Sequence, residues 1–320
     1  MAHRLFAALR LSLGAIALTA VSVILLAAPE FSEPAALAAK SLLLDISRAG
    51  NNLVAVGNRG HVVVSTDEGI TWSQSVTPTR AMLTGVSFAN ATHGWAVGHD
   101  GVIIATTDGG RTWTRQDDSQ DMETVFLDVH FRDANHGFAV GAYGRFVETA
   151  DGGRLWTARK VADSDFHFNR LTGGPGGLLY LVGEAGTVLV SRDAGRTWDV
   201  SEMPYEGSLF AAVPLDEHNV VVAGLRGHIL TSSDQGGSWT DHSSETKVLI
   251  SSGIRLENGA IIFAGQGGNF FLSSDSGETF NHWQPADFAT SIAEIIATSD
   301  GAIVTVGEAG AVKLTLPVIP

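Results

Sequence analysis

Three acidic residues stand at matching places in the chain and are the first candidates for chemistry. Asp45, Asp128 and Glu294 lie twelve, thirteen and thirteen residues before a glycine that recurs along the sequence. At equivalent positions of a repeat, such side chains are expected to line one central channel, where they could bind a cation or a sugar. Glycoside hydrolysis generally needs two facing carboxylates. Ordinary channel-lining residues would show the same pattern, so we predict no catalytic residues.

The histidines do not have the spacing of a metal site. His93 and His136 share one offset before the recurring glycine, and His61 and His228 share another just after it. Equivalent positions at the turns, unlike those on inner strands, point outward from a common scaffold instead of converging on one ion, and no spacing resembles a zinc site. The chain has no cysteine, which excludes disulfides, thiol catalysis and cysteine-ligated metals. We interpret the histidines as turn and rim residues and predict no metal and no cofactor.

A repeat of 41 to 43 residues positions all of these side chains. Its turn glycine appears seven times and is followed three residues later by a second glycine. Six repeats carry an aspartate ten residues after the turn glycine and an aromatic residue fifteen after it. The turn glycines are Gly57, Gly98, Gly141, Gly183, Gly224, Gly265 and Gly307. The aspartates are Asp67, Asp108, Asp151, Asp193, Asp234 and Asp275, and the aromatic residues are Trp72, Trp113, Trp156, Trp198, Trp239 and Phe280.

Each repeat divides into four short strands. The second strand ends at the turn glycine, the third follows it, and the fourth carries the aromatic residue. The inner strands are expected at residues 42–47, 83–88, 126–131, 209–215, 249–256 and 291–298. Four antiparallel strands in a unit of about forty residues are typical of a propeller blade. Seven turn glycines therefore predict an all-β fold, a seven-bladed β-propeller of four-stranded antiparallel blades.

The recurring octet Ser/Thr-x-Asp-x-Gly-x-Thr-Trp is best explained by structure. Its aspartate can accept N–H bonds across its own turn, and its glycine takes the positive-φ position. The aromatic side chain is expected to pack against a neighbouring blade, which removes on the order of 200 Å² from water. We predict that the six aspartates and the six aromatic residues hold the fold together.

Net charge and the N-terminal pattern limit the partner and the compartment. The formal net charge of −14 argues against a nucleic-acid binder, which needs a basic face. Residues 1–10 are positively charged and the eighteen residues 11–28 are apolar, which is typical of a signal peptide. That length also reaches the lower limit for a membrane-spanning helix. Residues 1–28 are therefore predicted to be a signal peptide removed on export or an N-terminal anchor. Residues 29–320 are predicted to form a single propeller, with 29–40 closing its last blade.

The last repeat lacks a fourth strand of its own. Pro317 stands at the position of its Asp-box aspartate. Propellers avoid a free sheet edge by closing the ring, so we predict that residues 29–35 supply the missing strand, with Phe31 as a seventh aromatic wedge. Cleavage after the Ala36-x-Ala38 site would remove this segment, whereas cleavage near residue 27 or an uncleaved anchor would keep it.

The octet is the Asp-box, and a longer string around it resembles one family. The segment from His93 to Trp113, HGWAVGHDGVIIATTDGGRTW, is similar to the repeat of the photosystem II assembly/stability factor family, and a looser copy occupies residues 136–156. The resemblance extends over residues 41–316. It implies a non-enzymatic, exported, monomeric propeller that helps a membrane protein complex assemble, in the periplasm or its thylakoid-lumen equivalent.

Asp-boxes also occur in sialidases and other glycoside hydrolases, which leaves an alternative function open. In that reading the propeller is a hydrolase or a lectin that acts on extracellular glycans. A sialidase needs three arginines that grip a carboxylate and a tyrosine nucleophile. The FRIP-type segment that normally supplies the first arginine is absent, and the chain has only three tyrosines.

A basic surface on the turns between second and third strands is the predicted partner site. Arg59 and Arg226 occupy the same turn position in two repeats, and arginine and tyrosine are favoured interface anchors. The predicted partner-binding residues are Arg59, Arg80, Tyr143, Arg145, Arg170 and Arg226, with Arg159 and Lys160 in adjoining loops. Ordinary solvated turn residues would look the same in the sequence. Arg111, Arg154 and Arg196 share an Asp-box offset and are expected at exposed hairpin tips on the opposite face.

Overall fold

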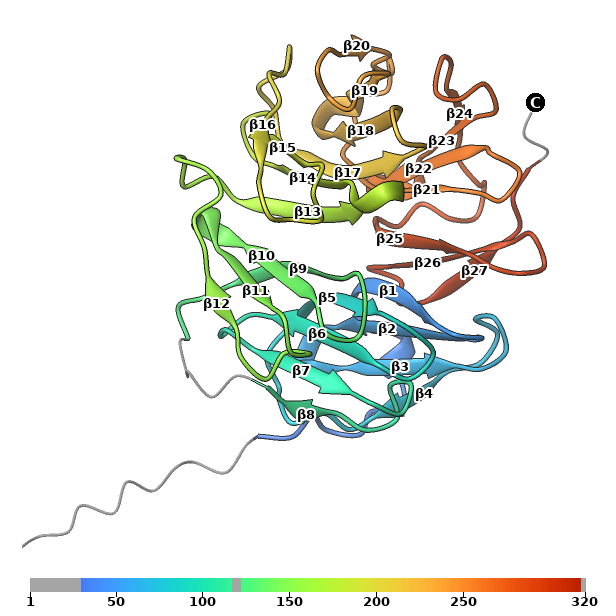
Figure 1. Cartoon of the computed structure of the whole chain (residues 1–320). Helices are drawn as coiled ribbons and strands as arrows, with labels where there is room; N and C mark the ends of the chain where they lie inside the picture. The colour runs from blue at the N-terminus through green and yellow to red at the C-terminus, as the bar shows by residue number, and fades with distance from the viewer. Residues whose placement is uncertain (1–29, 117–121, 318–320) are drawn as a thin grey trace, which may run out of the picture.

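The described part of the chain folds into seven antiparallel sheets that follow one another around a ring (Figure 1). The computed structural model describes residues 30–116 and 122–317. Six sheets have four strands and the last has three, and strands adjacent in sequence pair within each sheet. The predicted seven-bladed β-propeller is confirmed. Within the described ranges, no helix is long and apolar enough to cross a membrane.

The strands repeat in the same order in every blade. The inner strands of blades 1 to 7 are β1 (Leu43–Ala49), β5 (Leu83–Phe88), β9 (Phe126–Phe131), β13 (Phe168–Gly173), β17 (Leu209–Pro214), β21 (Ile250–Arg255) and β25 (Ile292–Ala297). The second strands are β2 (Asn52–Gly57), β6 (Gly94–Gly98), β10 (Gly137–Gly141), β14 (Leu179–Gly183), β18 (Val220–Gly224), β22 (Ile261–Gly265) and β26 (Ile303–Gly307). The third strands are β3 (Val62–Ser65), β7 (Ile103–Thr106), β11 (Phe146–Thr149), β15 (Val188–Ser191), β19 (Ile229–Ser232), β23 (Phe270–Ser273) and β27 (Val312–Leu314). The outer strands of blades 1 to 6 are β4 (Ser73–Ser75), β8 (Thr114–Arg115), β12 (Thr157–Ala158), β16 (Asp199–Val200), β20 (Thr240–Asp241) and β24 (Asn281–Trp283).

The strand ends form two faces. On the turn face, the turns between second and third strands meet the connections between blades, as where the N–H of Gly101 donates to the carbonyl of Thr124 at 2.7 Å. On the Asp-box face, the turns between third and outer strands meet the first hairpin of the same blade, as where the N–H of Gly109 donates to the carbonyl of Thr92 at 3.0 Å. The turns of each blade therefore belong to one of two faces.

Apolar side chains fill the spaces between blades. The second strands are buried along almost their whole length. Among the described residues the core consists of seven clusters, each shared by two neighbouring blades. Trp113 of blade 2, for example, packs with Val54 and Val64 of blade 1. The Asp-box aromatics of all six boxes join such a cluster with the preceding blade. Their predicted role as wedges between blades is confirmed.

The Asp-box aspartates bind their own turns. The Oδ1 atom of Asp67 accepts the N–H of Thr71 at 2.8 Å, and its Oδ2 atom accepts the Thr71 hydroxyl at 2.5 Å. The Ser65 hydroxyl accepts the N–H of Gly69, whose φ is +84°. The same pattern recurs at Asp108, Asp193, Asp234 and Asp275. The hydrogen bond from the Thr or Ser hydroxyl is the first cause that lowers the pKa of Asp67, Asp193, Asp234 and Asp275 to about 2.

The prediction that residues 29–35 complete blade 7 is wrong for the described residues 30–35. β27 pairs with β26, and no other described strand pairs with it. Ser32 lies instead beside the outer edge of blade 1, where its N–H donates to the carbonyl of Thr77 at 2.9 Å. Phe31 is 53% exposed and is not a wedge. Pro34 has no N–H to give to a ladder, which disfavours a strand here.

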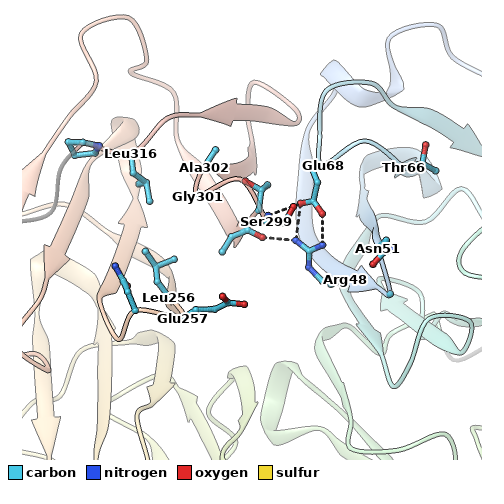
Figure 2. Close-up of a pocket in the computed structure, with 15 residues that line it drawn as sticks. Arg48, Asn51, Thr66, Glu68, Leu256, Glu257, Ser299, Gly301, Ala302 and Leu316 are labelled. Carbon is cyan, nitrogen blue, oxygen red and sulfur yellow. Dashed lines mark hydrogen bonds and ion pairs between the residues drawn. The ribbon is translucent and has the colours of Figure 1, made fainter.

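Other contacts close the ring between blades 7 and 1. On the turn face, the N–H of Ala311 donates to the carbonyl of Ala39 at 2.8 Å. On the Asp-box face, Arg48 of β1 makes two bonds of 2.9 and 3.1 Å to the carboxylate of Glu68 (Figure 2). A third bond of 2.7 Å runs from Arg48 to the carbonyl of Ala297 in β25. The bond to Ala297 links blade 1 directly to blade 7.

A cavity of about 1160 Å³ opens beside the Arg48–Glu68 pair (Figure 2). Its walls are hairpin turns of blades 1, 6 and 7, together with Leu316 and Pro317, which follow β27. The cavity therefore lies on the Asp-box face, where blades 6, 7 and 1 meet.

Candidate functional site

One residue of each inner strand lies at the same level around the central channel. Each pairs with the residue just before a turn glycine, as Asp45 does with Val56 and Arg170 with Val182. The seven residues at this level are Asp45, Gly85, Asp128, Arg170, Ala211, Ser252 and Glu294. The three acidic ones and Arg170 line a cavity of about 350 Å³. The predicted convergence of Asp45, Asp128 and Glu294 on one channel is confirmed.

Arg170 lies in this channel and not in a loop of the turn face. It belongs to β13. Its Nη1 atom lies 3.6 Å from the Oδ1 atom of Asp45 and 3.6 Å from the Oδ1 atom of Asp128. Its Nη2 atom donates to the Glu294 carboxylate. The prediction that Arg170 lies in an exposed loop is therefore wrong, and its role in partner binding stays a prediction. A polar inner strand resembles a loop in sequence, but Arg170 stands thirteen residues before Gly183, the offset of Asp128 and Glu294 from their own turn glycines. That offset could have identified it.

The channel carboxylates also join neighbouring inner strands. Asp45 of blade 1 accepts the N–H of Val86 in blade 2 at 2.6 Å. Asp128 of blade 3 accepts the N–H of Leu171 in blade 4 at 2.8 Å. Glu294 accepts the hydroxyl of Ser252 in blade 6. The carboxylate oxygens thus bind backbone N–H groups, the Ser252 hydroxyl and the Arg170 guanidinium. This pattern indicates a structural network.

Burial and the neighbouring charges shift the pKa values of this network. Burial raises the pKa of Asp45 to about 6, although the Arg170 guanidinium opposes the shift. Burial also raises the pKa of Asp128. Burial disfavours the charged form of Arg170, but the negative charges of Asp128 and Asp45 outweigh the effect of burial. The pKa of Arg170 is therefore raised. Among the residues that the structure describes, no group of three or more His, Asp or Glu is arranged to hold a metal ion.

The turn face presents side chains from an unusual backbone conformation. Arg59, Tyr143 and Arg226 occupy the same turn position in blades 1, 3 and 5, with φ of 57°, 56° and 57°. All three side chains are exposed, and the Tyr143 ring stands edge-on against His167, with centroids 5.0 Å apart. Asp100 has the corresponding position in blade 2, and Gly267 has it in blade 6. The structure therefore places these three predicted residues on one face, and their role in binding stays a prediction.

The other two predicted partner residues are less available. Arg145 is half-buried, and its Nε atom is buried without a hydrogen-bond partner in the described part of the chain. Arg80 donates to the carbonyl of Phe31 at 2.9 Å and pairs with Glu33 at 3.0 Å. Arg80 thus fastens the N-terminal segment, a contact between residues about fifty positions apart that no repeat pattern reveals.

The remaining arginines and the histidines make local contacts. Arg111, Arg154 and Arg196 are exposed on the Asp-box face, as predicted. Arg159 instead reaches the carbonyl of Gly195 in the next blade at 2.7 Å and ties two blades together. The four histidines of the repeat have separate partners: Ser41 for His61, Asn90 for His93, Asp133 for His136 and Ser243 for His228.

Comparisons with known proteins agree with this architecture. A solved structure described as YCF48 bound to D1 peptide is 20% identical, covers 87% of this chain and 94% of its own, and has a TM-score of 0.70. YCF48 from Cyanidioschyzon merolae is 19% identical over 86% and 96% of the two chains, also with a TM-score of 0.70. The WD40 β-propeller domain of Doa1 is 12% identical over 89% and 95%, with a TM-score of 0.68. At these identities the solved structures show the fold alone. No curated protein matches the chain.

The family model identifies the chain more closely than the solved structures do. The model for the Photosynthesis system II assembly factor YCF48 matches residues 65–123 and 116–316, from the first Asp-box to two residues past β27. These ranges include most of the described propeller. The chain therefore belongs to the family of the photosystem II assembly factor YCF48.

Proposed function

We propose that this chain is an exported, non-enzymatic scaffold whose turn face binds a segment of a membrane protein and assists assembly of its complex. The observation that carries the proposal is the display of Arg59, Tyr143 and Arg226 on left-handed backbone. For a residue other than glycine this conformation costs roughly 1 kcal/mol. Gly267 occupies the same place in blade 6, so the turn itself does not need a side chain. Asp100 and Ala185 adopt the same conformation in blades 2 and 4, so the strain belongs to the repeated turn. The support for a binding role is the presence of arginine or tyrosine, both favoured interface anchors, at three of these exposed positions.

The chemistry of these side chains points to an acidic or carboxylate-bearing segment. A guanidinium can bind a carboxylate with two parallel hydrogen bonds, and a tyrosine ring offers a rigid apolar surface. The relative whose structure contains a D1 peptide supports a peptide of a membrane protein as the ligand of this family. Export is supported by the charge and apolar pattern of residues 1–28, which lie outside the described residues.

The state of the channel supports a non-enzymatic role. A glycosidase needs one carboxylate free to give a proton and another free to attack or to activate water. Asp45 and Asp128 instead hold backbone N–H groups of the next blade and face Arg170. A screen against glycans and chromogenic glycosides should therefore show neither binding nor turnover.

Partner capture with matched charge reversals tests the proposal. The Arg59→Glu/Arg226→Glu variant reverses two exposed charges on the turn face, and Arg111→Glu/Arg196→Glu reverses two on the Asp-box face. Tagged protein is used to capture proteins from detergent-solubilised membranes of the source cell. We expect the first variant to lose the captured membrane protein, and the second to retain it, at equal melting temperatures. Loss only in the second variant would move the site to the Asp-box face.

A further inference from the structure

The residues before β1 are an integral part of the propeller. The segment 30–35 runs antiparallel to β4: Ser32 pairs with Thr77, and the N–H of Ala35 donates to the Gln74 side chain at 2.7 Å. The Gln74 side chain returns a bond of 2.9 Å to the carbonyl of Glu33. Ser32 is buried. The segment therefore covers the outer edge of blade 1, which would otherwise be a free strand edge.

The signal-peptidase-like site lies inside this folded part. Ala38 of the Ala36-x-Ala38 site is buried and begins a 3₁₀ turn, η1 (Ala38–Lys40), whose Ala39 carbonyl holds blade 7 through Ala311. Cleavage after Ala38 would remove the cover of blade 1. A cut nearer the apolar run, after residue 27, would place Leu25 at the position that normally takes a small residue. The folded domain thus begins about two residues after the apolar run, with no suitable site between them.

Exposed apolar side chains lie just beyond the end of that run. Phe31 and Val76 flank the bonded Ser32–Thr77 pair and are 53% and 47% exposed, and Leu37 is 65% exposed. Three residues span at most about 11 Å, so Phe31 lies within that distance of the end of the run at residue 28. The headgroup layer on each side of a bilayer is roughly 5–8 Å thick. If residues 11–28 remained in the membrane, Phe31 would therefore lie in the headgroup layer or within a few ångströms of it.

We propose that residues 11–28 are retained as an uncleaved anchor and that the outer rim of blade 1 rests on the lipid surface through Phe31, Leu37 and Val76. The proposal rests on the export proposed above, and it is independent of the partner. The lipid headgroups it fits are neutral or zwitterionic, because Glu30 and Glu33 flank the patch with 76% and 75% exposed side chains. A propeller mounted by its rim leaves the turn face free for a protein partner.

The anchor is tested by the intact mass of the full chain after expression in cells with an active signal peptidase. We expect the protein in the membrane fraction, resistant to alkaline extraction, with residues 11–28 present. A mature chain that starts at Ala39, or any chain that lacks residues 11–28, overturns the proposal. Secretion without these residues would leave the turn-face proposal standing, so the two failures are distinguishable.

The orientation is tested by fluorescent labels, for which the absence of native cysteine is convenient. Val76→Cys and Val200→Cys replace the same residue type at exposed positions of blades 1 and 4. Each full-length variant is labelled with an environment-sensitive dye and reconstituted in phosphatidylcholine vesicles that contain a doxyl-labelled lipid. We expect blue-shifted emission and at least twofold quenching at position 76, and neither at position 200. Equal quenching at the two positions, or none at position 76, refutes the rim-down orientation.

Discussion

Asp151 is the Asp-box aspartate with the fewest partners at its side-chain oxygens. Leu155 stands where the other boxes have Thr or Ser. Its N–H donates to Asp151 at 3.0 Å, but it has no side-chain hydroxyl to donate a second bond. The pKa of Asp151 is lowered first by that backbone bond and then by the Thr149 hydroxyl. The side chain of Leu155 is also largely exposed, so it gains little from its apolar character.

Restoring the missing hydroxyl should therefore stabilise blade 3. We predict that Leu155→Thr raises the melting temperature by about 1–2 °C, because one hydrogen bond to a charged group is added and an exposed leucine is removed. The reciprocal control, Thr112→Leu in blade 2, should lower it. Scanning calorimetry measures both changes, and a fall in the Leu155→Thr variant would contradict this account of the box.

Arg170 is the only cation among the seven residues at its level of the channel, and it compensates three carboxylates. Removing one partner of a buried charge network leaves the others unpaired and typically costs about 3–5 kcal/mol. We predict a loss of this size for Arg170→Met in urea unfolding. Arg226→Met, the same substitution at an exposed site, should change the free energy of unfolding by less than about 0.5 kcal/mol. Similar values for the two variants would show that the channel network is not stabilising.

The raised pKa of Asp45 gives the network a defined pH dependence. Its folded-state pKa of about 6 exceeds the ordinary 3.8, so its stabilising contribution is fully present below pH 3.8 and is lost as the pH rises through 6. Between pH 7 and pH 5 the wild type should gain about 1 kcal/mol relative to Asp45→Asn. The comparison isolates Asp45, because groups that do not sense its charge contribute equally to both proteins. Parallel stability curves would contradict the assignment.

At the scale of the blade, the sheet with three strands is the exception. Each of the first six blades protects its third strand with an outer strand, whereas β27 of blade 7 has no such neighbour in the ranges described. Strands with fewer backbone bonds open more readily than the core. We predict that the amides of β27 exchange with solvent faster than those of β19, the equivalent strand of blade 5. Equal protection would mean that another segment covers the edge of β27.

Elements that repeat were predictable from the sequence, and elements that occur once were not. The turn glycines and the Asp-boxes recur in phase, and so do six of the inner strands, so each copy supports the others. The inner strand of blade 4, β13, was not predicted, and it is the strand that carries Arg170. Phe31 shows the limit, since counting back 41 residues from Trp72 finds an aromatic residue but cannot tell which edge the chain pairs with. In the structure, tertiary contacts with Thr77 and Gln74 place this segment at the edge of blade 1.

At the scale of the whole molecule, the ring separates structural from exposed charges. The carboxylates and Arg170 of the channel, and the Arg48–Glu68 pair at the closure, are satisfied within the protein. The sequence could locate the channel acids because their offsets match. It could not show which arginines remain exposed, because the partners of Arg80 and Arg159 lie in other segments or blades.

Footprinting of the complex with the captured membrane protein tests the central claim most directly. Amide exchange is compared for the free and bound propeller at residues 58–60, 142–145 and 225–227 on the turn face, and at residues 109–112 and 194–197 on the Asp-box face. We predict at least tenfold slower exchange in the turn-face segments of the complex and no change in the Asp-box segments. Protection confined to the Asp-box segments, or spread equally over both faces, would contradict a partner site on the turn face.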